Sequence, residues 1–178
     1  MAITRTNANS ITALPAGVGG KVLQVVRGTS STQFVQASPT NNNIYYPSSN
    51  KISLSITPSS TSSKIIIQAI ATVRINKTEG GADDDISGAL AIKETISGGS
   101  TTEIIPESNA YDSGLYISFL DGTASFRLRL NEITERTPST TSEITYEVGL
   151  FAFARTINDI YLMPGNSRGE IIAYEVAG

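Results

Sequence analysis

Apolar and polar residues alternate with a period of two along much of the chain, which is the pattern of β-strands that bury one face. The clearest unit is residues 51–75, KISLSITPSSTSSKIIIQAIATVRI. Residues 52–56 alternate aliphatic and hydroxyl side chains, and residues 65–70 are rich in the β-branched type that packs well on a pleated surface. Because Pro58 has no N–H to donate, the Ser/Thr run between them is expected to be a turn. This unit predicts an all-β protein.

Further strands are predicted wherever alternating runs are bounded by turn-forming residues, and no segment has a convincing helical period. We expect strands at residues 21–27, 33–37, 44–46, 51–57, 64–75, 88–96, 102–105, 114–120, 124–130, 143–154, 159–163 and 168–177. Asp121 and Gly122 stand between two of these runs, and an Asp-Gly pair in that position predicts a hairpin. The whole pattern favours an antiparallel β-sandwich that is jelly-roll-like.

The first twenty residues are a poor core segment, because Gly, Asn and Pro interrupt the few apolar side chains. We therefore expect an extended N-terminal arm at residues 1–20 and one sandwich domain at residues 21–178. A disordered terminus is the alternative for the arm. A chain of 178 residues is long enough for one such domain with a full core.

The composition excludes several kinds of chemistry. Without Cys or His, the chain has no disulfide, no thiol nucleophile, no imidazole base and no zinc site built on those ligands. A Ser-His-Asp triad is impossible, and the acidic residues stand in no recognisable glycosidase context. Phosphate-binding and dinucleotide fingerprints are also absent. We predict that the protein is not an enzyme and that it needs no cofactor.

Charge and hydropathy argue against two classes of partner. The net charge of −3 and the pI of about 5.0 give no basic footprint for nucleic acid. No apolar run approaches the roughly 20 residues that a membrane-spanning helix needs. The first residues also lack the charged and apolar regions of a signal peptide, so none is expected.

Two groups of residues are candidates for exposed binding loops. Three consecutive aspartates have the oxygen ligands that suit Ca²⁺, but they lack the alternating spacing of a calcium loop, so a solvated loop tip is the simpler interpretation. Three tyrosines lie in or beside turns, where their rings would bind glycans or proteins unless they cap the core or a subunit seam. The candidates are Asp83, Asp84, Asp85, Tyr45, Tyr46 and Tyr111. No metal site is predicted.

Arg127 and Arg129 lie two residues apart on one predicted strand, so both face the same side of the sheet. The apolar residues that alternate with them are expected to face the core. A basic stripe on an outer face, next to Glu143 and Glu147, would suit a subunit interface. A pair of surface salt bridges of little energetic value is the alternative.

Three stretches, in this order along the chain, resemble small virion structural proteins of tailed bacteriophages. Residues 20–26 (GKVLQVV) are similar to the opening of such proteins, and residues 52–67 (ISLSITPSSTSSKIII) closely resemble their central signature. The end, with ITY at 144–146 and EIIAYEVAG at 170–178, is similar to their C-terminal pattern. The resemblance covers residues 20–178, and its central motif is the most specific part.

The resemblance implies a β-sandwich that usually forms a homotrimer on the outer surface of the virion. Such proteins are either head decoration (cement) proteins or the receptor-binding tips of tail fibres. This chain lacks the metal-stabilised stalk and the collagen-like or coiled-coil trunk of a long fibre, so decoration of the capsid fits better. The arm would then lie across the major capsid protein. The arm residues expected to make this contact are Ile3, Arg5, Ile11 and Leu14.

Two other functions stay open. In a receptor-binding tip, the tyrosine and aspartate candidates would recognise a glycan on the host surface. In a polysaccharide-degrading spike, two carboxylates would face each other across a cleft.

Overall fold

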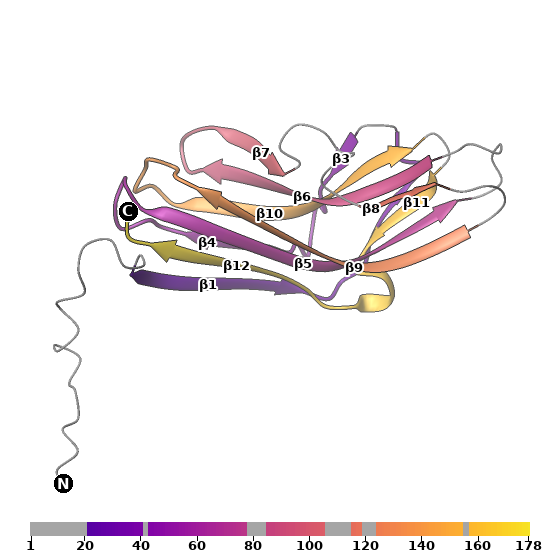
Figure 1. Cartoon of the computed structure of the whole chain (residues 1–178), viewed down its shortest axis with the longest axis horizontal. Helices are drawn as coiled ribbons and strands as arrows, with labels where there is room; N and C mark the ends of the chain where they lie inside the picture. The colour runs from indigo at the N-terminus through magenta and orange to yellow at the C-terminus, as the bar shows by residue number, and fades with distance from the viewer. Residues whose placement is uncertain (1–20, 41–42, 78–84, 106–114, 119–123, 155–156) are drawn as a thin grey trace, which may run out of the picture.

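The computed structural model describes residues 21–40, 43–77, 85–105, 115–118, 124–154 and 157–178. These residues form twelve strands and one short 3-10 helix, η2 (Pro164–Asn166). The strands make two antiparallel sheets that pack face to face into an elongated sandwich (Figure 1). This confirms the predicted all-β antiparallel sandwich. Within the described ranges there is no helix long and apolar enough to cross a membrane.

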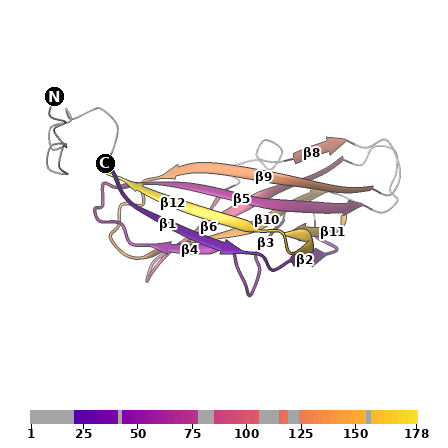
Figure 2. The same ribbon diagram turned by 90° about the horizontal axis from the view of Figure 1, so that it is seen from below.

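The first sheet, sheet A, is organised around its longest strand, β5. The six strands of sheet A are β1 (Val22–Ser30), β2 (Phe34–Ala37), β5 (Lys64–Lys77), β9 (Ala124–Arg136), β11 (Ile157–Leu162) and β12 (Gly169–Val176). Strand β9 pairs along one edge of β5 from end to end. The other edge of β5 is shared by two strands, with β12 paired to its first half and β11 to its second half. Strand β1 pairs with the far edge of β12, and β2 pairs with the far edge of β11. Strand β9 is therefore the last strand on its side of the sheet, as Figure 2 shows.

The second sheet, sheet B, has two long central strands and two short strands on each flank. Its six strands are β3 (Asn43–Tyr45), β4 (Ser53–Ile56), β6 (Asp85–Ile96), β7 (Thr101–Ile105), β8 (Leu115–Ser118) and β10 (Ile144–Ala154). Strands β10 and β6 pair along the whole of β10. Strands β4 and β3 share the other edge of β10, and β7 and β8 share the other edge of β6.

The core lies between the sheets and follows the predicted alternation. On β5 every second residue, from Ile65 to Ile75, is at most 3% exposed. On β10, Ile144, Tyr146 and Val148 are fully buried and meet them from the facing sheet. The predicted inward face of residues 143–154 is therefore confirmed.

The hairpin predicted at Asp121-Gly122 is wrong. Strand β8 pairs with β6 in sheet B, whereas β9 pairs with β5 in sheet A, so the two runs lie in different sheets. The physical reason is that β9 pairs with β5 at thirteen positions. The stabilisation from this long pairing outweighs the preference of Asp121-Gly122 for a tight turn between adjacent strands. The same pairing extends β9 to Arg136, beyond the predicted end at Leu130. By contrast, the predicted pairing of 88–96 with 102–105 is confirmed as the β6–β7 hairpin.

The two edges of the sandwich on the β1 side approach each other closely. A Cβ atom on Gly28 of β1 would lie 1.8 Å from the backbone oxygen of Ser53 on β4, so only glycine fits there. The Ser30 hydroxyl also donates to the carbonyl of Asn50 at 2.6 Å. Glycine at position 28 thus lets sheet A and sheet B close along this side.

Candidate functional site

Glu175 on β12 is a carboxylate that points into the sandwich and is fully buried. Its Oε1 accepts hydrogen bonds from the Ser59 N–H at 2.7 Å and from the Ser59 and Ser63 hydroxyls at 2.6 Å each. Its Oε2 accepts a bond from Gln24 Nε2 at 2.6 Å. Burial alone would raise the pKa of Glu175, but these hydrogen bonds outweigh it and lower the pKa to about 2. The carboxylate is therefore charged at neutral pH.

Each residue of this cluster, the Glu175 clasp, belongs to one of the three stretches that carry the phage resemblance. Gln24 lies in the first, Ser59 and Ser63 in the second, and Glu175 in the third. The Gln24 amide also donates to the carbonyl of Thr57 at 2.8 Å. These residues thus hold together the end of the sandwich where the C-terminus lies (Figure 1).

The outer face of sheet A carries an apolar patch near that end. Cross-strand register aligns Val25 with Tyr174 and Tyr174 with Ile66, and the neighbouring row contains Ile172 and Ile133. They lie on the face of the sheet away from the core, since on β12 and β5 the residues that alternate with them are buried. The apolar patch consists of Val22, Val25, Ile66, Ile70, Ile133, Ile172, Tyr174 and Val176.

Two members of this patch are highly exposed, and polar side chains lie among and beside them, with Gln68 between Ile172 and Ile133 in the register. Val25 and Ile133 are 56% and 59% exposed, which is unusual for aliphatic side chains on a sheet face. The charges beside the patch are already paired, with Lys64 Nζ 2.7 Å from Glu135 and Arg27 bound to Glu170. Exposed apolar side chains gathered among polar ones on one face are typical of protein–protein contact.

The other half of the same face is basic. Arg74 lies directly across from Arg127, and Arg129 lies across from Thr72. Together with exposed Arg168 these arginines form the basic patch. The predicted common orientation of Arg127 and Arg129 is confirmed, but their predicted acidic neighbours are wrong, because Glu147 lies in sheet B and Glu143 lies just before β10. Sheet assignment, which alternation alone does not determine, separates them.

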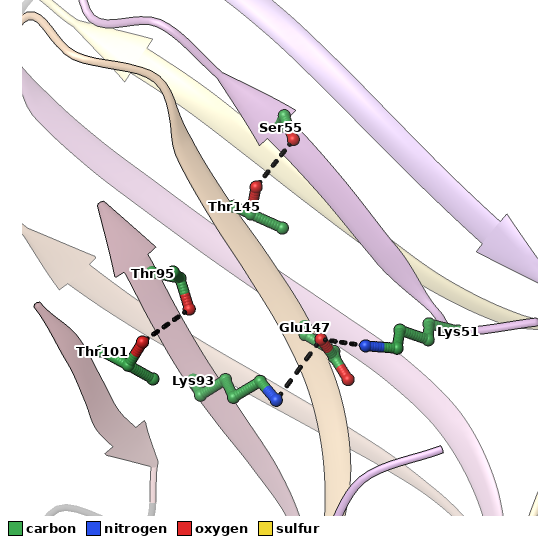
Figure 3. A network of polar contacts seen from close by, with 7 residues as sticks. All are labelled: Lys51, Ser55, Lys93, Thr95, Thr101, Thr145 and Glu147. Carbon is green, nitrogen blue, oxygen red and sulfur yellow. Dashed lines mark hydrogen bonds and ion pairs between the residues drawn. The ribbon is translucent and has the colours of Figure 1, made fainter. Parts of the chain in front are cut away.

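The outer face of sheet B carries a polar network (Figure 3). Glu147 Oε2 accepts contacts from Lys51 Nζ at 3.0 Å and from Lys93 Nζ at 3.4 Å. Its carboxylate is almost fully buried beneath these side chains, and Oε1 has no hydrogen-bond partner among the described residues. The network ties β10 to β6 and to the segment before β4.

A row of four hydroxyls crosses sheet B beside this network. The register aligns Ser55, Thr145, Thr95 and Thr101 on four neighbouring strands. The outer pairs are in hydrogen-bond contact, at 2.9 Å for Ser55 with Thr145 and 3.2 Å for Thr95 with Thr101 (Figure 3). This row is a partly exposed line of hydrogen-bond donors and acceptors.

Tyr46 is held against its own sheet rather than presented to solvent. Its ring covers Gly149, where a Cβ atom would lie 2.6 Å from ring carbons. Lys93 Nζ lies 4.1 Å from the ring centroid, and the Tyr46 hydroxyl donates to Glu103. Burial and the Glu103 carboxylate both raise the pKa of Tyr46 well above its ordinary value.

The structure brings few of the predicted loop residues together. Tyr45 packs partly against the core, and its hydroxyl accepts a bond from the Thr40 N–H at 2.7 Å. The backbone of Asp85 begins β6. The other predicted site residues lie outside the described residues; they are Ile3, Arg5, Ile11, Leu14, Asp83, Asp84 and Tyr111.

A second buried carboxylate, that of Glu94, links sheet B to β9 through hydrogen bonds in the interior. Glu94 on β6 accepts a hydrogen bond from the Tyr146 hydroxyl at 2.8 Å and from Arg136 at 3.2 Å. Sequence reasoning missed both this group and Glu175. The available signal was an acidic residue at an inward position of an alternating strand, which needs buried partners to be tolerated.

No family model matches the chain, and no curated protein does. Among solved structures, a T13 particle of infectious bursal disease virus is 11% identical over 89% of this chain and 36% of the viral chain, with a TM-score of 0.34. A subviral particle of the same virus is 14% identical over 88% and 39%, with a TM-score of 0.31. A Bacteroides thetaiotaomicron lipoprotein is 12% identical over 89% and 94%, with a TM-score of 0.29.

The chain therefore spans less than two fifths of the length of these two viral chains. Similarity at this level gives no information on function.

Proposed function

We propose that the chain is a structural subunit of a bacteriophage virion, namely a homotrimeric decoration protein on the outside of the capsid. The observation that carries the proposal is the apolar patch on sheet A, which a subunit contact would bury. The resemblance to phage virion proteins supports it, and residues from the three stretches of that resemblance meet in the Glu175 clasp.

The proposed role is mechanical and not catalytic. Residue 21, where the arm ends, lies beside the C-terminus, since the Ala177 N–H donates to the Lys21 carbonyl at 2.9 Å. From there, residues 1–20 would lie across the major capsid protein, with Ile3, Arg5, Ile11 and Leu14 in the contact. Binding only to the assembled shell stabilises it by mass action, and three linked arms gain avidity.

Antibody labelling of intact virions, imaged by electron microscopy, tests the location. We expect label distributed over the head, and heads without the protein should lose their genome at a lower temperature. Label confined to the tail tip would contradict decoration and leave the second candidate.

The second candidate is recognition of a host surface glycan by a tail-fibre or spike domain. The hydroxyl row on sheet B favours it, because hydroxyl groups both donate hydrogen bonds to sugar hydroxyls and accept them. Soluble protein that competes with phage adsorption would support this function. Unchanged adsorption at saturating protein would remove it.

A further inference from the structure

The outer edge of β9 is a long edge to which no described strand is paired. Strand β9 has thirteen residues and, among the described strands, pairs only with β5. Figure 2 shows it along the margin of sheet A. An edge of this kind presents backbone N–H and C=O groups that can accept another strand.

The arginines beside this edge make no ion pair among the described residues, although the charges of Arg129 and Arg168 act on Glu170 from a longer distance. The described residues place no carboxylate within ion-pair distance of Arg74, Arg127 or Arg129. Arg74 stacks on the Tyr161 ring at 3.7 Å, and its Nε is buried with no hydrogen-bond partner in the described structure. Because Arg74 and Arg127 are direct cross-strand neighbours, their like charges repel each other. The basic patch therefore attracts an anionic group.

The spacing of Arg127 and Arg129 indicates the form of that group. Two residues along a strand are about 6.6 Å apart on one face, and an added strand repeats the same spacing. Acidic residues at alternate positions of such a strand would stand opposite both arginines as cross-strand pairs.

We propose that the free edge of β9 binds an extended acidic segment of a partner protein as an additional strand of sheet A. The segment lies antiparallel to β9, like every pairing in both sheets. Its acidic residues face Arg127 and Arg129, and an apolar residue faces Ile133. An acidic glycan would satisfy the charges but would leave the β9 backbone unpaired.

The register gives the sequence of a test peptide. Opposite positions 135 to 127, read in that order, complementary residues are KTVTTVDVD: lysine faces Glu135, valine faces Ile133, and the aspartates face Arg129 and Arg127. In a second peptide, KTVTTVVDD, the same residues are present but the aspartates are adjacent, so they point to opposite faces. A third peptide carries backbone N-methyl groups at alternate positions, which removes the donors of one edge.

Binding of the labelled peptides to the purified full chain is measured by fluorescence anisotropy. We expect KTVTTVDVD to bind about tenfold more tightly than KTVTTVVDD and than its N-methylated form. Hydrogen exchange should show new protection of β9 amides in the complex. The variant Arg127→Gln/Arg129→Gln should lose about tenfold in affinity. Arg27→Gln, on the same face but already paired with Glu170, should bind within about twofold of the wild type.

Three outcomes would overturn the proposal. Equal binding of KTVTTVDVD and KTVTTVVDD would show that the spacing is not recognised. Equal binding of polygalacturonate, with no protection of β9, would indicate a general anion site. Absence of peptide binding would mean that the arginines only prevent other strands from pairing with this edge. None of these results depends on where the protein lies in a virion.

Discussion

At the scale of single residues, a charged carboxylate inside the sandwich places the strictest demand on its neighbours. Glu175 is buried, charged and supplied with four donors, so its stability contribution depends on keeping all of them. Its identity as a strand residue was predictable from the alternating run at 168–177. Its partners were not, because Gln24 is 151 positions away in sequence and no local pattern encodes that contact.

Replacing Glu175 with Gln should destabilise the fold by about 2 kcal/mol, because an amide nitrogen would face donors that now meet an oxygen. Urea denaturation followed by circular dichroism measures the change. Glu135→Gln, in an exposed pair with Lys64, is the matched control and should cost less than about 0.5 kcal/mol. Equal effects of the two substitutions would contradict the role of the clasp.

The clasp also predicts an acid dependence. The folded pKa of Glu175 is lowered to about 2 from an ordinary value of 4.5. Its stabilisation is therefore complete above pH 4.5 and is lost as the pH falls from 4.5 towards 2. The free energy of unfolding of the wild type should decline across this window, and that of Glu175→Gln should decline less. Parallel curves for the two proteins would refute the assignment.

At the scale of elements, local alternation located most strands but could not assign them to sheets. Strands β4 and β5 flank the Ser/Thr turn as predicted, yet β4 joins sheet B and β5 joins sheet A. The same limitation produced the wrong hairpin between β8 and β9. Pairing is decided by the length and complementarity of the available edges, which are properties of distant segments.

The closure of β1 against β4 gives a prediction at this scale. Gly28→Ala places a methyl group on the Ser53 carbonyl and should destabilise the fold by about 2–3 kcal/mol, because the two backbones must separate. Thermal unfolding of this variant beside Thr29→Ala, an exposed change on the same strand, measures the effect. An unchanged midpoint for Gly28→Ala would show that the two edges are not in contact in solution.

At the scale of the whole molecule, the two halves of the outer face of sheet A differ in character. Sequence alone could indicate that Arg127 and Arg129 share a face, but the apolar patch needs the register of four strands to become visible. Residues 1–20, Asp83 and Asp84 lie outside the described residues, so the predictions made for them remain predictions.

If the apolar patch is the subunit contact, Val25→Lys/Ile133→Lys should convert the oligomer into a folded monomer. Both side chains are more than half exposed, so the fold itself should be unaffected. Light scattering after gel filtration measures the mass. Val35→Lys is the control, because Val35 is 39% exposed but lies outside the patch. A wild type that is already monomeric at micromolar concentration would contradict the trimer.

The bond between the Ala177 N–H and the Lys21 carbonyl has a practical consequence for display on particles. Cargo fused after residue 178 would emerge beside residue 21. In the proposed decoration role it would then lie close to the capsid surface that residues 1–20 contact. Cargo inserted at η2 would be held well away from the C-terminus, beyond the other end of β12 (Figure 1). The fold thus offers a proximal and a distal attachment point on one domain.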